Sequence, residues 1–321
     1  MVPEQALVDR FRSDVDALVE PGARIGLAVS GGPDSLALLL LAAAARPGQV
    51  EAATVDHGLR PEAREEAQMV ARLCEGLDLP HAVLTARWKD DPATAIQERA
   101  RGERYRLLGY WAEERGLGAI ATGHHADDQA ETLLMRLARG SGVRGLAGMR
   151  PRSITPGSHA PLVRPLLGWR RSELERICKE AGVAPVADPS NDDEKFERVR
   201  VRRELSEAPW LDPAAIARSA AHLAEADAAL DWAMKTEWKR AVRAGRDNIV
   251  YRNDGAPAEI QRRIVARAVR KLATEGEMEL RGSELDRLMT SLIAGDTATL
   301  RGVLCRGGLE WRFTSAPPRR S

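Results

Sequence analysis

The sequence has few cysteines, and their spacing argues against several classes of protein. Cys74, Cys178 and Cys305 lie far apart, and they form no Cys-x-x-Cys pair. This arrangement argues against a disulfide framework, a zinc site and an iron–sulfur cluster, and it fits the reducing cytoplasm.

The sequence also lacks long apolar runs, and its formal net charge is close to zero. The longest apolar stretch, Leu36 to Ala45, is too short to span a membrane, and the first residues do not have the pattern of a signal peptide. We therefore expect a cytoplasmic protein without a membrane partner. Lys and Arg together number 48 against 47 Asp and Glu, so any surface that binds nucleic acid must be local.

The Walker pattern of phosphate-binding loops is absent, but another glycine-rich turn is present. An apolar run begins at residue 25 and ends in a turn that is followed by the apolar residues 36–41. The turn consists of Ser30, Gly31, Gly32, Pro33, Asp34 and Ser35. This pattern predicts a strand, a tight loop and a buried helix. Free backbone N–H groups and a helix N-terminus then lie together, and both favour a bound phosphate.

The residue types in this turn suit a nucleotide that carries Mg²⁺. Glycines let the backbone approach an anion closely, and the two serines add hydroxyl donors. Asp34 supplies a carboxylate that can hold Mg²⁺ beside the phosphates. The alternative is an ordinary helix start, in which Asp34 or Ser35 caps the helix and nothing is bound. We favour the phosphate loop because a cap does not need so many glycines and serines.

Predicted strands and helices alternate over the first half of the chain. After a first helix over 5–20, the strands cover 25–29, 50–55, 80–84 and 119–123, and the helices cover 33–45, 62–77, 94–115 and 127–139. This order predicts an α/β fold, a doubly wound parallel sheet with helices on both faces. Ligands of such sheets bind at the carboxyl ends of the strands, where the polar clusters 30–35, 56–60 and 123–128 fall.

The composition changes near residue 206, where we place a domain boundary. Residues 140–168 lack periodicity and are expected to form a long loop, followed by a helix over 170–182 and a polar, arginine-rich segment over 186–204. Beyond the boundary we expect helices at 213–242, 257–274 and 283–294 and a β-hairpin over 298–313. The prediction is a domain of residues 1–205 followed by a smaller, mainly helical domain of residues 206–321.

A second polar cluster follows the fourth predicted strand. Residues 123–132 read Gly-His-His-Ala-Asp-Asp-Gln-Ala-Glu-Thr and crowd ionisable groups at a helix start. His124 and Asp128 stand four apart, as do Asp127 and Glu131, so each pair shares a helix face. We reject zinc because no third histidine or cysteine is close in the sequence. General acid–base catalysis, Mg²⁺ binding and a purely structural helix start stay open.

Arginines form two further candidate sites. Arg101 and Arg104 lie three apart in a predicted helix, where they meet phosphate or form a solvated basic face. Farther along, the turn 188–191 leads into a positive patch that suits an RNA or ATP phosphate. The patch consists of Arg198, Arg200, Arg202 and Arg203.

In this order, the segments resemble the tRNA(Ile)-lysidine synthetases, a family of the PP-loop ATP pyrophosphatase superfamily. The Ser-Gly-Gly-x-Asp-Ser loop is shared across the superfamily, whereas the run 123–132 joined to Arg-Gly-Ser-Gly at 139–142 is more specific to this family. Residues 55–60, 145–149, 164–167 and 188–191 also match. The resemblance covers about residues 20–205.

The resemblance implies a two-step reaction. ATP adenylylates the C2 oxygen of the wobble cytidine in a tRNA(Ile) with a CAU anticodon, and the ε-amine of free L-lysine then displaces AMP. By residue, it implies that 30–35 bind the ATP phosphates and that Asp34 holds Mg²⁺. It further implies that His124 and Asp128 serve lysine, and that Arg104 and Arg202 meet the phosphates or the activated base.

Two departures limit the resemblance. The family usually has asparagine after the first arginine of the late patch, and this chain has Val199, which leaves the role of Arg198 open. The part beyond 206 resembles only the shorter family members, so no tRNA contact is assigned there. The sequence does not fix the oligomeric state, and a homodimer stays open.

Rival functions exist within and outside the superfamily. RNA 2-thiolation enzymes use paired or catalytic cysteines that this chain lacks. NAD and GMP synthetases use ammonia and would not explain the late basic patch. A non-catalytic nucleotide-binding regulator would not need the ionisable cluster at 123–131.

Overall fold

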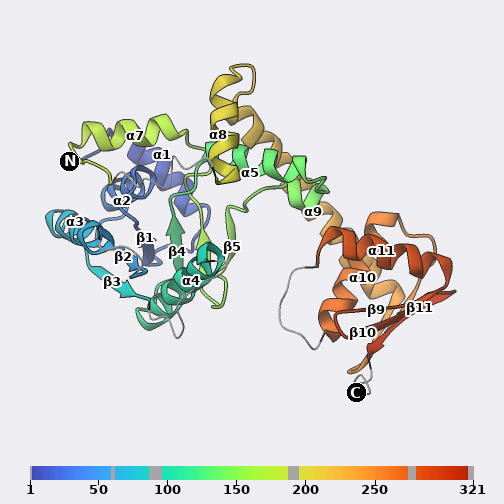
Figure 1. The fold of residues 1–321 in the computed structure, drawn as a ribbon. Helices are drawn as coiled ribbons and strands as arrows, with labels where there is room; N and C mark the ends of the chain where they lie inside the picture. The colour runs from blue at the N-terminus through green and yellow to red at the C-terminus, as the bar shows by residue number, and fades with distance from the viewer. Residues whose placement is uncertain (1, 59–61, 87–95, 187–194, 274–279, 317–321) are drawn as a thin grey trace. The chain divides into compact units, whose positions relative to one another are not determined.

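The computed structural model describes residues 2–58, 62–86, 96–186, 195–273 and 280–316. The chain forms two compact units (Figure 1). The first comprises the residues up to 140 together with 145–221, and the second comprises 141–144 together with 222–321. Residues 206–221 thus belong to the first unit, and the division into domains 1–205 and 206–321 stays a prediction about which segments fold independently.

The first unit is built on a six-stranded sheet with the order β3-β2-β1-β4-β6-β5. Its parallel strands are β1 (Ile25–Ala28), β2 (Val50–Asp56), β3 (His81–Thr85), β4 (Ala119–Thr122) and β6 (Pro161–Val163), and β5 (Arg152–Ile154) pairs antiparallel with β6. The predicted α/β fold is confirmed. Chain order reverses between β1 and β4, where Ala28 lies opposite Thr122, and such a switch point forms a crevice at the carboxyl ends of the strands.

Alternating strand residues supply two apolar layers. On one face, Leu27 and Ala121 pack with helices, and on the other face Ile120 packs against a different helix. The first face is covered by α1 (Gln5–Asp16), α2 (Pro33–Ala45), α3 (Glu62–Gly76) and α7 (Arg171–Glu180), and the second by α4 (Ile96–Glu114) (Figure 1). Residues 36–42 of α2 are all buried, which explains the continuous apolar run after the phosphate loop.

The segment 140–168 contains more regular structure than expected, and the prediction of one long loop is corrected. It holds the short helix α6 (Val143–Leu146) and the edge strands β5 and β6. The Gln129 side chain on α5 (Ala126–Ala138) fixes part of it, since its Nε2 donates to the Met149 carbonyl at 2.8 Å and its Oε1 accepts from the Met149 amide at 2.7 Å. Gly148 allows this approach, because a Cβ there would lie 2.5 Å from Gln129 Oε1.

The second unit combines helices with a five-stranded antiparallel sheet. The helices are the later part of α9 (Pro213–Ala241), α10 (Ala258–Leu272) and α11 (Gly282–Ala294). The sheet has the order β7-β8-β11-β10-β9, formed by β7 (Val242–Ala244), β8 (Asn248–Arg252), β9 (Thr297–Leu300), β10 (Val303–Arg306) and β11 (Glu310–Ser315). The predicted helices are confirmed, and so is the hairpin, as β10 and β11. The other three strands were not predicted.

Two arginines organise the polar part of this unit. Arg263, with a side chain only 5% exposed, donates to Asp227 at 2.6 Å and to Asp231 at 3.0 Å. Arg144 donates to the same Asp231 carboxylate at 2.7 Å, which ties the segment 141–144 to this unit. None of the helices in the described ranges has the length and apolar character needed to cross a membrane.

Candidate active site

The loop after β1 has the form expected of a phosphate-binding turn. The Ser35 hydroxyl closes the turn, because it donates to the Gly32 carbonyl at 2.9 Å and accepts from the Ser30 amide at 3.1 Å. Gly31 has φ +88°, and a Cβ there would lie 3.2 Å from Val186 Cγ2. Gly32 is the N-cap of α2, and neither Asp34 nor Ser35 is the capping residue. The first amides of α2 therefore lack a side-chain cap and suit an anion.

The end of β4 touches this loop directly. A Cβ on Gly123 would lie 2.8 Å from the Asp34 carbonyl oxygen and 3.1 Å from the Ser35 amide nitrogen, so a side chain there would displace the loop. From the sequence, Gly123 was predicted to end the strand and to begin the second polar cluster. Its close approach brings the second polar cluster beside the phosphate loop.

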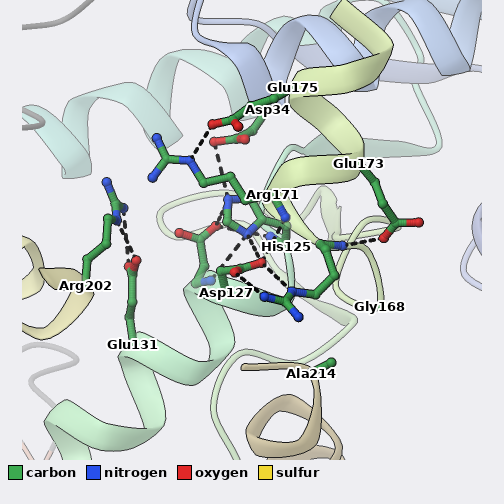
Figure 2. Close-up of polar contacts among 12 residues, drawn as sticks. Asp34, His125, Asp127, Glu131, Gly168, Arg171, Glu173, Glu175, Arg202 and Ala214 are labelled. Atoms are coloured by element: carbon green, nitrogen blue, oxygen red, sulfur yellow. Dashed lines mark hydrogen bonds and ion pairs between the residues drawn. The ribbon is translucent and has the colours of Figure 1, made fainter. Parts of the chain in front are cut away.

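Asp34 has one carboxylate oxygen in contact with a histidine and one without a partner. Its Oδ2 lies 3.4 Å from Nε2 of the buried His125 (Figure 2). Its Oδ1 is buried and accepts no hydrogen bond from the described residues. A buried unpaired carboxylate oxygen is costly, so this atom fits a cation. Mg²⁺ commonly binds through one or two carboxylates together with substrate phosphates and water, and this donor set suits it.

No group of three His, Cys, Asp or Glu in the described part of the chain could hold a metal by itself. A metal at Asp34 would therefore take most of its ligands from substrate oxygens and water.

His125, the neighbour of the predicted His124, is a site residue that was not predicted from the sequence. It is the N-cap of α5, where its amide donates to Asp128 Oδ2 at 3.1 Å and its Nδ1 accepts from the Asp128 amide at 3.4 Å. Burial lowers the pKa of His125, but the hydrogen bond to Asp34 and the charges of Asp128 and Asp34 outweigh burial, so the net pKa is raised. The His-x-x-Asp spacing of a capping box is the signal that could have identified it.

His124 lies beside Thr122 and close to several arginines, not beside Asp34. Its Nδ1 lies 2.8 Å from Thr122 Oγ1. Burial, assisted by the positive charges of Arg164, Arg101 and Arg198, lowers the pKa of His124 to about 4. His124 is therefore neutral near pH 7, where it can accept a hydrogen bond.

Asp128 lies close to both histidines. Its Oδ2 is 3.6 Å from His125 Nε2. Burial raises the pKa of Asp128, but the charges of His125, Arg198 and His124 outweigh burial, so the net pKa is lowered. His125 thus stands between the carboxylates of Asp34 and Asp128. Asp128 is ionised near pH 7, which suits a cationic ligand as well as a metal.

Asp127 and Glu131 have separate tasks. Asp127 accepts from the Arg171 amide at 2.9 Å and from the Arg170 guanidinium at 3.3 Å, which fixes the start of α7 (Figure 2). Glu131, with a side chain 2% exposed, faces α8 (Glu197–Glu207) instead. The sequence places Glu131 in the ionisable cluster at 123–132, but it was not selected there as a site residue. The spacing predicted a face shared with Asp127, whereas the two side chains contact different helices.

Two arginines of α8 bind Glu131. Arg202 Nε lies 2.7 Å from Glu131 Oε1, and Arg198 Nε lies 2.9 Å from Oε2. Arg198 also donates to Thr132 Oγ1 at 3.2 Å, which gives it a structural contact although Val199 replaces the usual asparagine. The predicted Arg202 is thereby held beside the helix that carries Asp128.

Arg104 lies on α4 and contacts another predicted segment. Its Nε is 3.5 Å from Nε2 of His57, which follows β2. Asp56 accepts from the Gly58 amide at 2.8 Å, so this segment begins as a tight turn. The turn 188–191 and residues 59–60 lie outside the described residues.

Comparison with known proteins gives this arrangement a family. Residues 5–208 match the PP-loop domain. A tRNA(Ile)-lysidine synthase of Novosphingobium aromaticivorans is 49% identical over 315 residues, which cover 97% of this chain and 94% of that protein. The chain belongs to the tRNA(Ile)-lysidine synthase family. A tRNA(Ile)-lysidine synthase of Zymomonas mobilis is 44% identical over 299 residues, covering 92% and 90% of the two chains.

A solved structure outside the lysidine synthase family shares the fold. The U34-tRNA thiolase of Methanococcus maripaludis aligns with a TM-score of 0.57 at 16% identity, over 69% of this chain and 81% of that one. This likeness concerns the fold alone. In the chain described here, Cys74, Cys178 and Cys305 are all buried and form no disulfide.

Proposed function

We propose that the chain joins free L-lysine to C2 of the wobble cytidine of a tRNA(Ile) with a CAU anticodon, and that it consumes ATP and releases AMP and pyrophosphate. The observation that carries this proposal is the meeting of two polar clusters at the β1/β4 switch point, where Gly123 touches the phosphate loop. One cluster suits ATP phosphates and Mg²⁺, and the other offers an ionised carboxylate beside a neutral histidine. All three substrates occur in the cytoplasm, where the enzyme would act.

The first step requires activation of a poor leaving group. The C2 oxygen of cytidine leaves readily only after it has been converted to an AMP ester. The amides at the start of α2 and the hydroxyls of Ser30 and Ser35 would hold the phosphates in line for attack. Mg²⁺ on Asp34 would neutralise charge on the phosphates. Arg104 and Arg202 are proposed to meet the phosphates or the activated base.

The second step requires a lysine ε-amine that has lost its proton. The carboxylate of Asp128 would attract the ammonium group and accept the proton that it loses, and the neutral imidazole of His124 would accept a hydrogen bond and orient the amine. His124, with a pKa of about 4, does not keep a proton near pH 7. We therefore propose that His124 orients the amine and that Asp128 attracts its positive charge.

Nucleoside analysis tests the proposed product. A CAU-anticodon tRNA(Ile) transcript is incubated with enzyme, ATP, Mg²⁺ and L-lysine, then digested and analysed by mass spectrometry. We expect lysidine to replace one cytidine, and a transcript with a wobble guanosine serves as control. An unmodified cytidine, or pyrophosphate release with ammonia in place of tRNA, would point to another member of the superfamily.

The double change His124→Ala and Asp128→Ala tests the assignment of these residues to lysine. We expect the variant to form adenylylated tRNA, whereas excess lysine discharges it poorly, with a tenfold to hundredfold higher lysine requirement. Lost charge-assisted hydrogen bonds of about 1.5–3 kcal/mol each give this scale. Loss of adenylylation itself would show that Asp128 shares the metal with Asp34. A homodimer is a separate proposal, which light scattering of the purified chain would decide.

A further inference from the structure

Arg164 is a buried cation at the carboxyl edge of the sheet. It directly follows β6, which pairs in parallel with β4 so that Val163 lies opposite Ala121. Its Nη1 donates to the Arg150 carbonyl at 2.7 Å and to Ser153 Oγ at 3.1 Å. The residue is 8% exposed, and its Nε is buried with no hydrogen-bond partner among the described residues.

A second cation lies close to Arg164. Arg101 on α4 places its guanidinium 5.1 Å from the ring centroid of Tyr105. Burial and the nearby positive charge of Arg101 lower the pKa of Arg164. Within the described ranges no carboxylate pairs with Arg101 or Arg164. Positive charge from both residues acts on His124 and lowers its pKa. Arg164 is buried without an anionic partner, which is costly, whereas Arg101 is exposed and adds positive charge from solvent, so the pair favours a bound anion.

We propose that Arg164 and Arg101 form an anion subsite for the α-carboxylate of the free lysine substrate. This inference rests on the proposed function, which requires an amino acid beside His124. Guanidinium groups bind carboxylates through two parallel hydrogen bonds, and the unpartnered Nε of Arg164 is one such donor.

The order of the strands favours a carboxylate over the ATP phosphates. The phosphate loop follows β1, whereas Arg164 follows β6, and β4 lies between these strands. Strands in a sheet are about 4.8 Å apart, so β1 and β6 are separated by roughly 10 Å. His124 follows the intervening β4, and β4 pairs directly with β6, the strand that Arg164 follows. The lysine side is therefore the nearer source of an anion.

Lysine analogues that lack the carboxylate test the subsite. Cadaverine keeps both terminal amines but has no carboxylate, and L-lysinamide has an uncharged amide instead. In the full chain, Arg101→Gln should raise the KM for L-lysine tenfold to hundredfold, the scale of a lost charge-assisted hydrogen bond. The same variant should leave the use of cadaverine and the KM for ATP unchanged. Arg164→Lys keeps a charge without the planar fork and should show a smaller rise of the same kind.

Arg106→Gln is the matched control, because Arg106 lies on the same helix and pairs with Glu103 at 2.6 Å. It should alter neither lysine nor cadaverine use. Equal losses with lysine and cadaverine in Arg101→Gln would overturn the subsite, and so would a raised KM for ATP with lysine use intact.

Calorimetry of L-lysine binding to the full chain separates this inference from the proposed function. Weakened L-lysine binding in Arg101→Gln, with cadaverine binding unaltered, supports the subsite whichever nucleoside the wild-type enzyme makes. Failure to make lysidine would instead contradict the proposed function alone. Unaltered L-lysine binding in the variant would overturn the subsite.

Discussion

Asp34 is the residue on which we expect the proposed first half-reaction to depend most. Its carboxylate has one oxygen near His125 and one buried oxygen without a partner among the described residues. Asp34→Asn removes the charge but keeps the shape, so the fold should persist while the metal loses its protein ligand. We expect adenylylation to slow by two or more decades at saturating Mg²⁺, because the metal stabilises charge on the phosphates.

Single-turnover adenylylation, with circular dichroism to verify the fold, measures this effect. Glu103→Gln is a suitable control, because Glu103 is a carboxylate on α4 that pairs with Arg106. Near-normal turnover of Asp34→Asn would remove Asp34 from the mechanism.

His124 should make stability depend on pH. Its pKa falls from 6.5 in the unfolded chain to about 4 in the folded one, so the unfolded state binds more protons in this window. Stability must therefore decrease as the pH falls from 6.5 toward 4. At 1.36 kcal/mol per pH unit, and allowing for partial solvent access, the loss due to His124 is about 1–3 kcal/mol.

Urea unfolding at pH 7.5 and pH 4.5 measures this contribution. His124→Gln should lose about 1–3 kcal/mol less between the two pH values than the wild type does. The raised pKa of His125 affects stability at higher pH. Its contribution is fully present below pH 6.5 and is lost as the pH rises through the folded pKa. An identical pH dependence in the variant would mean that His124 is not held neutral by the fold.

The residue types of the site were predictable from the sequence, but the pairing of neighbours was not. The turn of residues 30–35 and the cluster after β4 were both predicted from glycines and ionisable groups, and both lie at the switch point. The His-x-x-Asp spacing could mark His125 as the cap of α5, but it could not show which of the two adjacent histidines meets Asp34. That choice depends on the backbone where β4 ends and α5 begins, because the N-cap position turns His125 inward.

At the level of elements, α8 is held to α5 by buried charge. Glu131 accepts from Arg202 at 2.7 Å, and both side chains are at most one-third exposed, at 2% and 32%. A buried pair contributes more than a surface pair, since loss of one partner leaves a charge without compensation. We expect a coupling free energy of about 1–3 kcal/mol in a double-mutant cycle of Glu131→Gln and Arg202→Gln.

Hydrogen exchange of the amides in residues 197–207 measures the free energy of local opening of α8, from which the coupling is obtained. The exposed pair Asp9 and Arg12 on α1, 2.6 Å apart, is the control and should couple by less than about 1 kcal/mol. Additive effects of the two changes at Glu131 and Arg202 would show that the pair does not fix α8.

Long, strongly patterned elements were predictable, and short ones were not. The buried helix α2 and the amphipathic α10 were predicted nearly to their ends, because an apolar run or a helical period extends over many residues. The strands β5, β6 and β7 have three residues each and show no readable period. Their places in the sheets come from tertiary pairing, such as that of β6 with β4.

For the whole molecule, near-zero net charge makes tRNA binding a local property. Lys and Arg exceed Asp and Glu by a single residue, so particular arginines must neutralise the phosphates. Arg200 and Arg203 are exposed on α8, the helix whose other face carries Arg202. The double change Arg200→Ala and Arg203→Ala should reduce the slope of log K against log salt by up to about two units. Filter binding over a range of salt concentrations measures the slope, and an unchanged slope would place the RNA footprint elsewhere.

We propose that this molecule cleaves ATP at the α-phosphate with tRNA as the acceptor, and that lysine enters afterwards. The direct measurement uses ATP labelled at the α-phosphate, with CAU-anticodon tRNA(Ile) and no lysine. We predict that label appears on the tRNA as pyrophosphate is released, and that added L-lysine discharges it as AMP while lysidine forms. Label that never reaches the tRNA without lysine, or release of ADP in place of pyrophosphate, would contradict this order of steps.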